Sequence, residues 1–209
     1  MAENRDAYKI KLFQDETARC VRRLYREGHL PNESLGSVST RDAESGNVFI
    51  SIKPGTFYVG DPGNYHGSDI AVVDADGRPL RDTTPPSDML ALHLAIYRAR
   101  PDVTAIIHSH PVWCSLFAQR KEALPYVLAE QMEASTAVGC VGMAPSMTQA
   151  YFDEVVRVLA DQKFVMLYNF GTISVGDNVD NAINYLAWME SVAEKITLAS
   201  MIGELNHIE

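Results

Sequence analysis

The stretch Ala105-Ile-Ile-His-Ser-His110 places an apolar run directly before two histidines. The apolar residues of 103–108 predict a buried strand, which Pro111 ends. Residues i and i+2 of a strand point to the same face, so His108 and His110 can converge on one ion at the edge of a sheet. Imidazole is a common neutral metal ligand in proteins. On spacing alone, the alternative is a chance pair whose ring nitrogens are hydrogen-bonded within the fold.

Apolar patterning on both sides of this stretch predicts further helices and strands. We expect helices at 8–28, 87–100, 113–120, 152–162 and 178–204. Strands are expected at 37–40, 48–53, 70–73, 103–108, 164–168 and 173–175. A turn at Asp76-Gly77 predicts a hairpin from 70–73 to 78–81, while 125–141 shows no clear pattern. The sequence therefore predicts one α/β domain over residues 1–209, with a central sheet covered by helices.

Composition narrows the class of partner. The chain has 209 residues, a net charge of −9 and a pI near 5.1, which argues against nucleic acid or an anionic membrane as its main partner. The N-terminus is polar and no apolar run approaches the roughly 20 residues that span a bilayer. The three cysteines form no C-x-x-C motif and are expected to be buried, reduced thiols. We expect a cytoplasmic protein.

Asp88 is a second candidate for chemistry. Pro85-Pro86-Ser87-Asp88 precedes an apolar helical pattern, with Ser87 as the expected N-cap and Asp88 in the first turn. Asp88 can serve as a general acid or base beside a metal. The alternative is an acidic residue favoured at this position by the helix dipole alone.

Two short loops rich in small residues could bind an anion. One contains Gly36 and Ser37, and the other is Lys53-Pro54-Gly55. Their backbone amides and the Lys53 charge suit a phosphate, although ordinary turns have the same composition. By contrast, His93 lies within an apolar helical pattern and is expected to be a packed, hydrogen-bonded core histidine.

Taken in order, these segments resemble the class II aldolase/adducin family, which includes fuculose-phosphate aldolases and ribulose-phosphate 4-epimerases. The resemblance runs from about residue 10 to 200. It rests on Leu35-Gly-Ser-Val-Ser-Thr-Arg41, Ile52-Lys-Pro-Gly55, Pro86-Ser-Asp88, His93-Leu-Ala-Ile-Tyr97, Ala105-Ile-Ile-His-Ser-His110 and Gly171-Thr-Ile-Ser-Val-Gly176.

The resemblance implies a three-layer α/β/α domain with a mixed, mainly antiparallel sheet. It also implies a homotetramer with active sites between subunits. His108 and His110 would be two of three histidine ligands to a divalent metal, zinc first, with manganese or iron as alternatives. Asp88 would be the catalytic acid or base, and Ser37, Lys53, Gly55 and Ser87 would bind substrate.

The chain departs from the family pattern at three places. The third histidine ligand of the family is replaced by Phe170, which cannot bind a metal. Asp88 could then complete a set of two histidines and one carboxylate. Ser37 and Pro86 stand where the family has asparagine and serine, which removes donors for a phosphate. Finally, the chain ends near His207, which could take the place of a tyrosine from the longer tail of many relatives.

Three functions follow from this pattern. The first is a metal-dependent aldolase, other lyase or epimerase that acts on a small hydroxy-carbonyl compound, including sugar phosphates, through a metal-stabilised enediolate. The second is a decarboxylase or other lyase of the same fold with an unphosphorylated substrate, favoured by the altered phosphate loops. The third is a non-catalytic family member with a degraded metal site, favoured by Phe170.

Overall fold

The computed structural model describes residues 2–30, 36–52, 62–80, 84–143 and 147–208. The helices are α1 (Ala2–Arg26), α2 (Leu90–Ala99), α3 (Val112–Ala118), α4 (Gln131–Ala134), α5 (Gln149–Leu159) and α6 (Val179–Ser200), with short 3₁₀ turns at Pro62–Asn64 and Gly67–Asp69. The strands are β1 (Ser37–Arg41), β2 (Val48–Ser51), β3 (Ile70–Val73), β4 (Ala105–Ser109), β5 (Cys140–Gly142), β6 (Phe164–Tyr168) and β7 (Gly171–Gly176).

The seven strands form one sheet in the order β3-β2-β1-β4-β7-β6-β5. Every neighbouring pair is antiparallel except β5 and β6, which run parallel. The mixed, mainly antiparallel sheet expected from the sequence is therefore confirmed. Strand β4, which carries the opening stretch, lies in the middle of this order.

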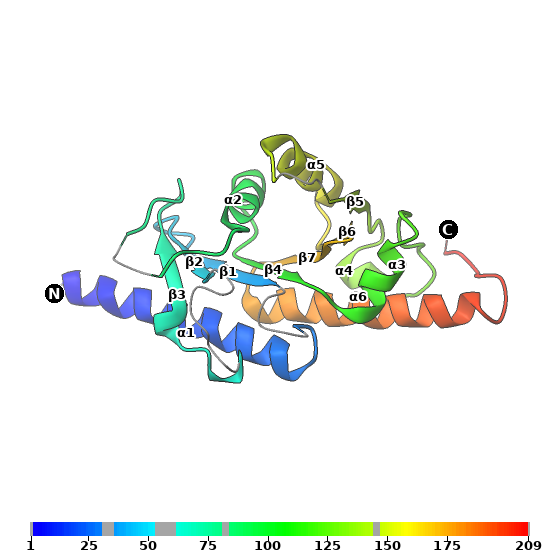
Figure 1. Cartoon of the computed structure of the whole chain (residues 1–209), viewed down its shortest axis with the longest axis horizontal. Coiled ribbons are helices and arrows are strands. Elements are labelled where there is room, and N and C mark those ends of the chain that lie inside the picture. The colour runs from blue at the N-terminus through cyan, green and yellow to red at the C-terminus, as the bar shows by residue number, and fades with distance from the viewer. Residues whose placement is uncertain (1, 31–35, 53–61, 81–83, 144–146, 209) are drawn as a thin grey trace.

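Helices cover both faces of the sheet (Figure 1). Ile106 packs in a core with α2 and α5, while its neighbour Ile107 packs on the other face in a core with α1, α3 and α6. A central strand that is covered on both faces has no polar side, which is why 105–107 is a continuous apolar run. The three-layer α/β/α architecture is confirmed. No described helix is both long and apolar enough to cross a membrane.

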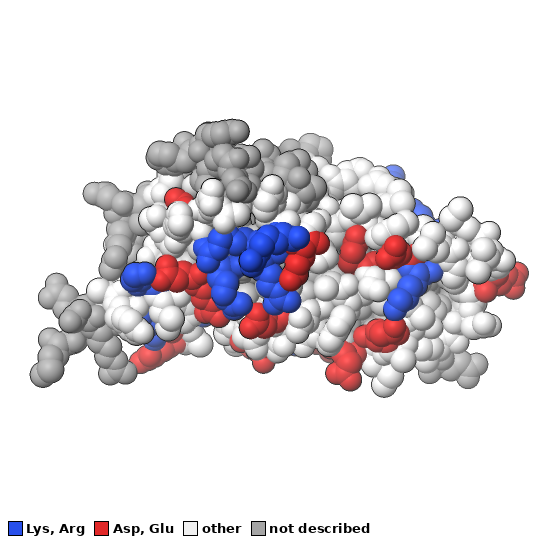
Figure 2. All heavy atoms as spheres, turned by 90° about the horizontal axis from the view of Figure 1, so that it is seen from below, with Lys and Arg blue, Asp and Glu red and all other residues white. Residues whose placement is uncertain are grey.

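The face formed by α1 and α6 gathers basic side chains among acidic ones (Figure 2). Arg19 and Arg23 both contact the Asp180 carboxylate, at 3.3 and 3.1 Å, and Arg23 also pairs with Glu27. Much of the positive charge gathered on this face is thus balanced locally within the chain. These exposed pairs add little to stability, since side-chain entropy and solvent screening offset their attraction.

Several element boundaries differ from those expected. Helix α2 begins at Leu90 rather than at Ser87, because the Ser87 N–H bonds to the Ser51 carbonyl (2.9 Å) and holds the preceding segment beside β2. Of the expected hairpin from 70–73 to 78–81, the described residues form a short part: a bridge between Val73 and Pro79, with the Asp74 N–H on the Arg78 carbonyl (2.9 Å) and the Leu80 N–H on the Val72 carbonyl (3.0 Å). Of the expected buried thiols, Cys140 is only half-buried, while Cys20 and Cys114 are buried.

Replacing Ala160 with glycine should raise the free energy of unfolding by about 1 kcal/mol. Ala160 has φ 46° and ψ −123° in a turn closed by the Gln162 N–H on the Leu159 carbonyl (2.9 Å). This conformation is easy only for glycine. Urea unfolding measures the change. As a matched control, Ala187→Gly within α6 should destabilise by a similar amount; a destabilised Ala160→Gly protein would refute the assignment of strain.

Candidate active site at one edge of the sheet

Sheet register brings separate parts of the chain to one edge. Ser37, the first residue of β1, pairs with His108 near the end of β4, and Ser109 pairs with Thr172 near the start of β7. On the other side of β1, the end of β2 carries the segment of Ser87. The segments that contain four of the predicted site residues therefore meet at this edge: His108, His110, Ser37 and Ser87.

Two histidines and one phenylalanine form a cluster of rings at this edge. The ring centroids of His108 and His110 are 5.0 Å apart, and the Phe170 centroid lies 4.8 Å from His108 and 6.1 Å from His110. Imidazoles bound to one tetrahedral ion have centroids about 5 Å apart, since each metal–nitrogen bond is about 2.0–2.1 Å long. The His108–His110 spacing fits two ligands of one ion, and Phe170 lies near the position of a third.

The ring of His108 is buried and makes one hydrogen bond within the described part of the chain. Its Nε2 lies 2.8 Å from the Phe170 carbonyl oxygen, while Nδ1 is buried without a partner. A carbonyl only accepts, so Nε2 carries the proton and Nδ1 keeps its lone pair. A ring N–H held by a carbonyl, with the other nitrogen unprotonated, is typical of metal-binding histidines. The unprotonated Nδ1 of His108 is therefore suited to bind a metal.

Burial keeps both rings neutral. It lowers the pKa of His108 to about 4, against an opposing effect of the hydrogen bond to Phe170, and it also lowers the pKa of His110. Only neutral imidazole can bind a metal. Both histidines are therefore in the metal-binding protonation state at neutral pH.

Gly171 makes the close approach of β7 to the histidines possible. Its φ is +86°, and a Cβ at this position would clash with the Ser109 carbonyl oxygen and lie 3.1 Å from His110 Nδ1. Asn169, two residues earlier, also has a positive φ of 64°. The β6–β7 turn can therefore bring Phe170 against the histidine pair only with glycine at position 171.

His93 is a core residue, as predicted. It is fully buried on α2, with Nε2 2.9 Å from the Ser37 hydroxyl and Nδ1 2.7 Å from the Ser39 hydroxyl. Burial lowers the pKa of His93 to about 3, so the ring is neutral. Ser37, a predicted substrate ligand, is itself 2% exposed and bonded to His93.

The remaining predicted site residues are placed less centrally. Asp88 is exposed just before α2, and within the described ranges no group of three His, Cys, Asp or Glu side chains could hold a metal. The suggested ligand set of Asp88 with both histidines is not assembled within the described residues of one chain. Lys53 and Gly55 lie outside the described residues, and His207 is exposed near the C-terminus.

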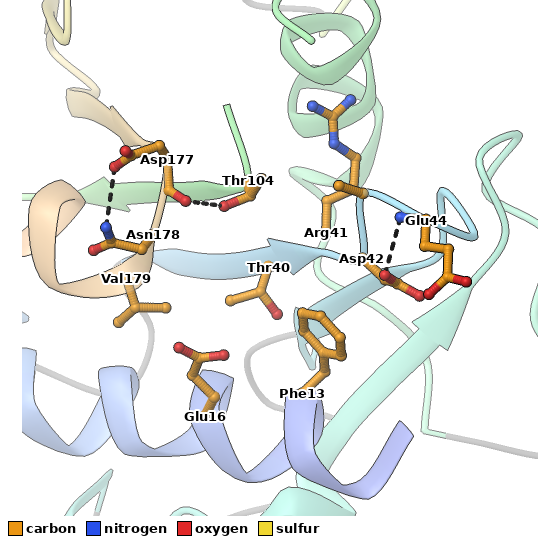
Figure 3. Close-up of a pocket in the computed structure, with 11 residues that line it drawn as sticks. Phe13, Glu16, Thr40, Arg41, Asp42, Glu44, Thr104, Asp177, Asn178 and Val179 are labelled. Carbon is orange, nitrogen blue, oxygen red and sulfur yellow. Dashed lines mark hydrogen bonds between the residues drawn. The ribbon is translucent and has the colours of Figure 1, made fainter. Parts of the chain in front are cut away.

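Two features of the structure were not found from the sequence. The Glu190 carboxylate of α6 accepts hydrogen bonds from the backbone N–H groups of Trp113 and Cys114, in the first turn of α3. Glu190 falls in the region of family resemblance, but no motif indicates this contact. A hollow of about 410 Å³ also opens beside Phe13, Thr40 and Val179 (Figure 3). Thr40 pairs with Ala105, at the opposite end of β1 and β4 from His108, so this hollow is separate from the histidine pair.

The fold is a three-layer α/β/α domain with a histidine pair at one edge of its mixed sheet. Residues 15–197 match the model of the Class II Aldolase and Adducin N-terminal domain, and the chain belongs to this family.

Several similar proteins are named as sugar-phosphate aldolases. The chain is 27% identical to 5-deoxy-D-ribulose 1-phosphate aldolase of Bacillus thuringiensis serovar kurstaki, over 81% of this chain and 77% of that protein. It is 26% identical to L-fuculose phosphate aldolase of Haemophilus influenzae, over 66% of each. A solved L-fuculose 1-phosphate aldolase superposes with a TM-score of 0.86 at 24% identity, over 94% of this chain and 90% of that one. YgbL of Escherichia coli, described as a putative aldolase/epimerase/decarboxylase, gives 0.79 at 22% identity, over 96% and 95%.

Proposed function

We propose that this protein is an aldolase that cleaves a carbon–carbon bond of a small hydroxy-carbonyl compound, with a ketose 1-phosphate as substrate. The observation that carries the proposal is the convergence of His108 and His110 at the edge where Ser37 and the Ser87 segment also meet. Membership of the class II aldolase family and the names of its relatives support this chemistry.

We assign a divalent metal, zinc first, to the histidine pair, with manganese or iron as alternatives. His108 and His110 would hold it, and the other positions would be filled by water or substrate. When bound, such an ion polarises a carbonyl and stabilises an enediolate. Two imidazoles bind more weakly than three, so we expect this metal to be exchangeable.

Asp88 is the residue that we propose for proton transfer. Cleavage of an aldol requires removal of the hydroxyl proton as the carbon–carbon bond breaks, and a proton must then be returned to the enediolate carbon. A carboxylate at the edge can do both in turn, because it is exposed to entering substrate. Ser87, Ser37 and the segment of Lys53 and Gly55 would bind the substrate phosphate.

One observation favours the alternative of an unphosphorylated substrate. The Ser37 hydroxyl is buried and bonded to His93, so it is less available to a phosphate than a free hydroxyl would be. A decarboxylase or other lyase of the same fold is therefore the second candidate.

We also propose a homotetramer with the active sites between subunits. Val112 and Leu116 lie one turn apart on α3, the helix that follows His110, and are 64% and 54% exposed. Apolar side chains exposed together in this way favour burial against another surface, here a second copy of the chain. A cytoplasmic location stays a prediction.

Purified, untagged protein supplied with Zn²⁺ should cleave L-fuculose 1-phosphate or 5-deoxy-D-ribulose 1-phosphate to dihydroxyacetone phosphate and an aldehyde. Asp88→Asn should lower kcat by about 100-fold or more, since general acid–base catalysis contributes about 10²–10⁴-fold. The exposed Asp153→Asn on α5 is the control and should keep full activity. A coupled assay for dihydroxyacetone phosphate measures both. Cleavage of unphosphorylated ketoses alone would favour the second candidate, and cleavage of neither class would contradict the proposal.

A further inference from the structure

Helix α3 starts at Val112, two residues after His110, without a side-chain cap of its own. Its N-cap residue is Pro111, which has no side-chain hydrogen bond to offer. The first N–H groups of a helix need partners from outside the helix. Here two of them find a partner in another helix: the Glu190 carboxylate of α6 accepts from the Trp113 N–H (2.7 Å) and from the Cys114 N–H (2.8 Å).

This arrangement fixes α3 to α6 at one point. Each carboxylate oxygen accepts one backbone N–H. Two hydrogen bonds therefore fix where the first turn of α3 lies relative to α6. A negative charge at a helix N-terminus is also favoured by the helix dipole, and hydrogen bonds to an ionised acceptor are stronger than neutral ones. The cap is therefore well suited to hold the first turn of α3 in place.

The same cap restrains His110, because only His110 and Pro111 join β4 to α3. Pro111 has φ −64°, which its ring fixes, so movement of the first turn of α3 passes to the His110 backbone. On the other side, the ring of His110 lies against Gly171. His110 is thus held between β7 and the capped helix, while His108 is held within β4 by the sheet itself.

We propose that Glu190 is a positioning residue for His110: by capping α3 it keeps the His110 ring at its working distance from His108. The inference rests on the proposed function, in which this pair is the active site. Glu190 touches neither ring through any described contact, so its effect must pass through the backbone of α3.

Glu190→Gln tests the inference with little change in volume, because an amide has one acceptor oxygen and loses one of the two hydrogen bonds. Glu190→Asp keeps the charge with a shorter reach and should recover part of the loss. Glu194→Gln, one turn further along α6, is the matched control. With Co²⁺ as the probe, Glu190→Gln should weaken binding about 10-fold and lower kcat more than it raises KM, as loss of support for a metal ligand typically costs 10–100-fold.

A readout that needs neither metal nor activity separates this inference from the proposed function. In metal-free protein, the ¹H–¹⁵N ring signals of His110 should shift in Glu190→Gln, while those of the core residue His93 stay in place. The inference is overturned if the Trp113 and Cys114 amide signals shift but the His110 ring signals do not, because Glu190 would then be a structural cap only. Absence of metal binding and activity in wild-type protein would count against the proposed function and would leave the ring signals as the deciding test for Glu190.

Discussion

Replacing Phe170 with histidine should raise the affinity for Zn²⁺ by about 100-fold. The Phe170 ring already lies 4.8 and 6.1 Å from the two histidine rings, near the spacing of imidazoles on one ion. Structural zinc sites with four protein ligands bind with about 10–16 kcal/mol, so a third ligand is worth roughly 3 kcal/mol, or about 100-fold. Isothermal titration calorimetry with Zn²⁺ on metal-free protein measures the change.

Phe170→Leu is the matched control for this variant. It removes the aromatic ring without adding a donor, and its affinity should stay within a few-fold of wild type. Equal affinity of Phe170→His and Phe170→Leu would contradict the placement of residue 170 at the third ligand position. A fall in native activity in Phe170→His despite tighter metal binding would show that the phenylalanine has been adapted to the substrate.

Mild acid should destabilise the metal-free protein through its buried histidines. The pKa values of His93 and His108 are lowered by burial to about 3 and about 4, from 6.5 in an exposed histidine. Below pH 6.5 the unfolded chain therefore binds protons that the folded chain does not. Stability is present above pH 6.5 and is lost as the pH falls, by about 1.4 kcal/mol per pH unit for each group. Because this slope is reached only well below pH 6.5 and is half as large at pH 6.5 itself, the two histidines together should cost about 3 kcal/mol between pH 6.5 and 5.

Urea unfolding at several pH values with a chelator present measures this loss. The window above pH 5 largely avoids the titration of carboxylates. His93→Asn should be less stable than wild type at pH 7 but lose stability less steeply as the pH falls. His207→Asn, at an exposed histidine, should follow wild type. A His93→Asn slope as steep as that of wild type would show that His93 is not held neutral in the fold.

Most of the fold was predictable because its signals are local. Strand β6 coincides with the predicted 164–168, and β4 differs from 103–108 only at its ends, since apolar runs report burial directly. Boundaries set by distant partners were not predictable. The start of α2 depends on a bond from Ser87 to β2, and α4 and β5 lie in a region without a periodic pattern.

The candidate site was predictable in part. Strand spacing places His108 and His110 together, and the family pattern marks Phe170 as the departure. Neither could show that Ser37 is bonded to His93 or that Glu190 holds the helix after His110, because these contacts join residues 56 and 76–77 positions apart. Such pairs carry no sequence signature when each partner is an ordinary residue type.

The central claim is that His108 and His110 form one metal site at the edge of the sheet. Zn²⁺ titration of untagged wild-type protein against His108→Ala and His110→Ala tests it most directly, with His66→Ala at an exposed histidine as the control. We predict that wild type and the control take up about one equivalent per chain and that each site variant loses it. Uptake below about a tenth of an equivalent by wild type, or uptake by both site variants equal to that of wild type, would contradict the claim.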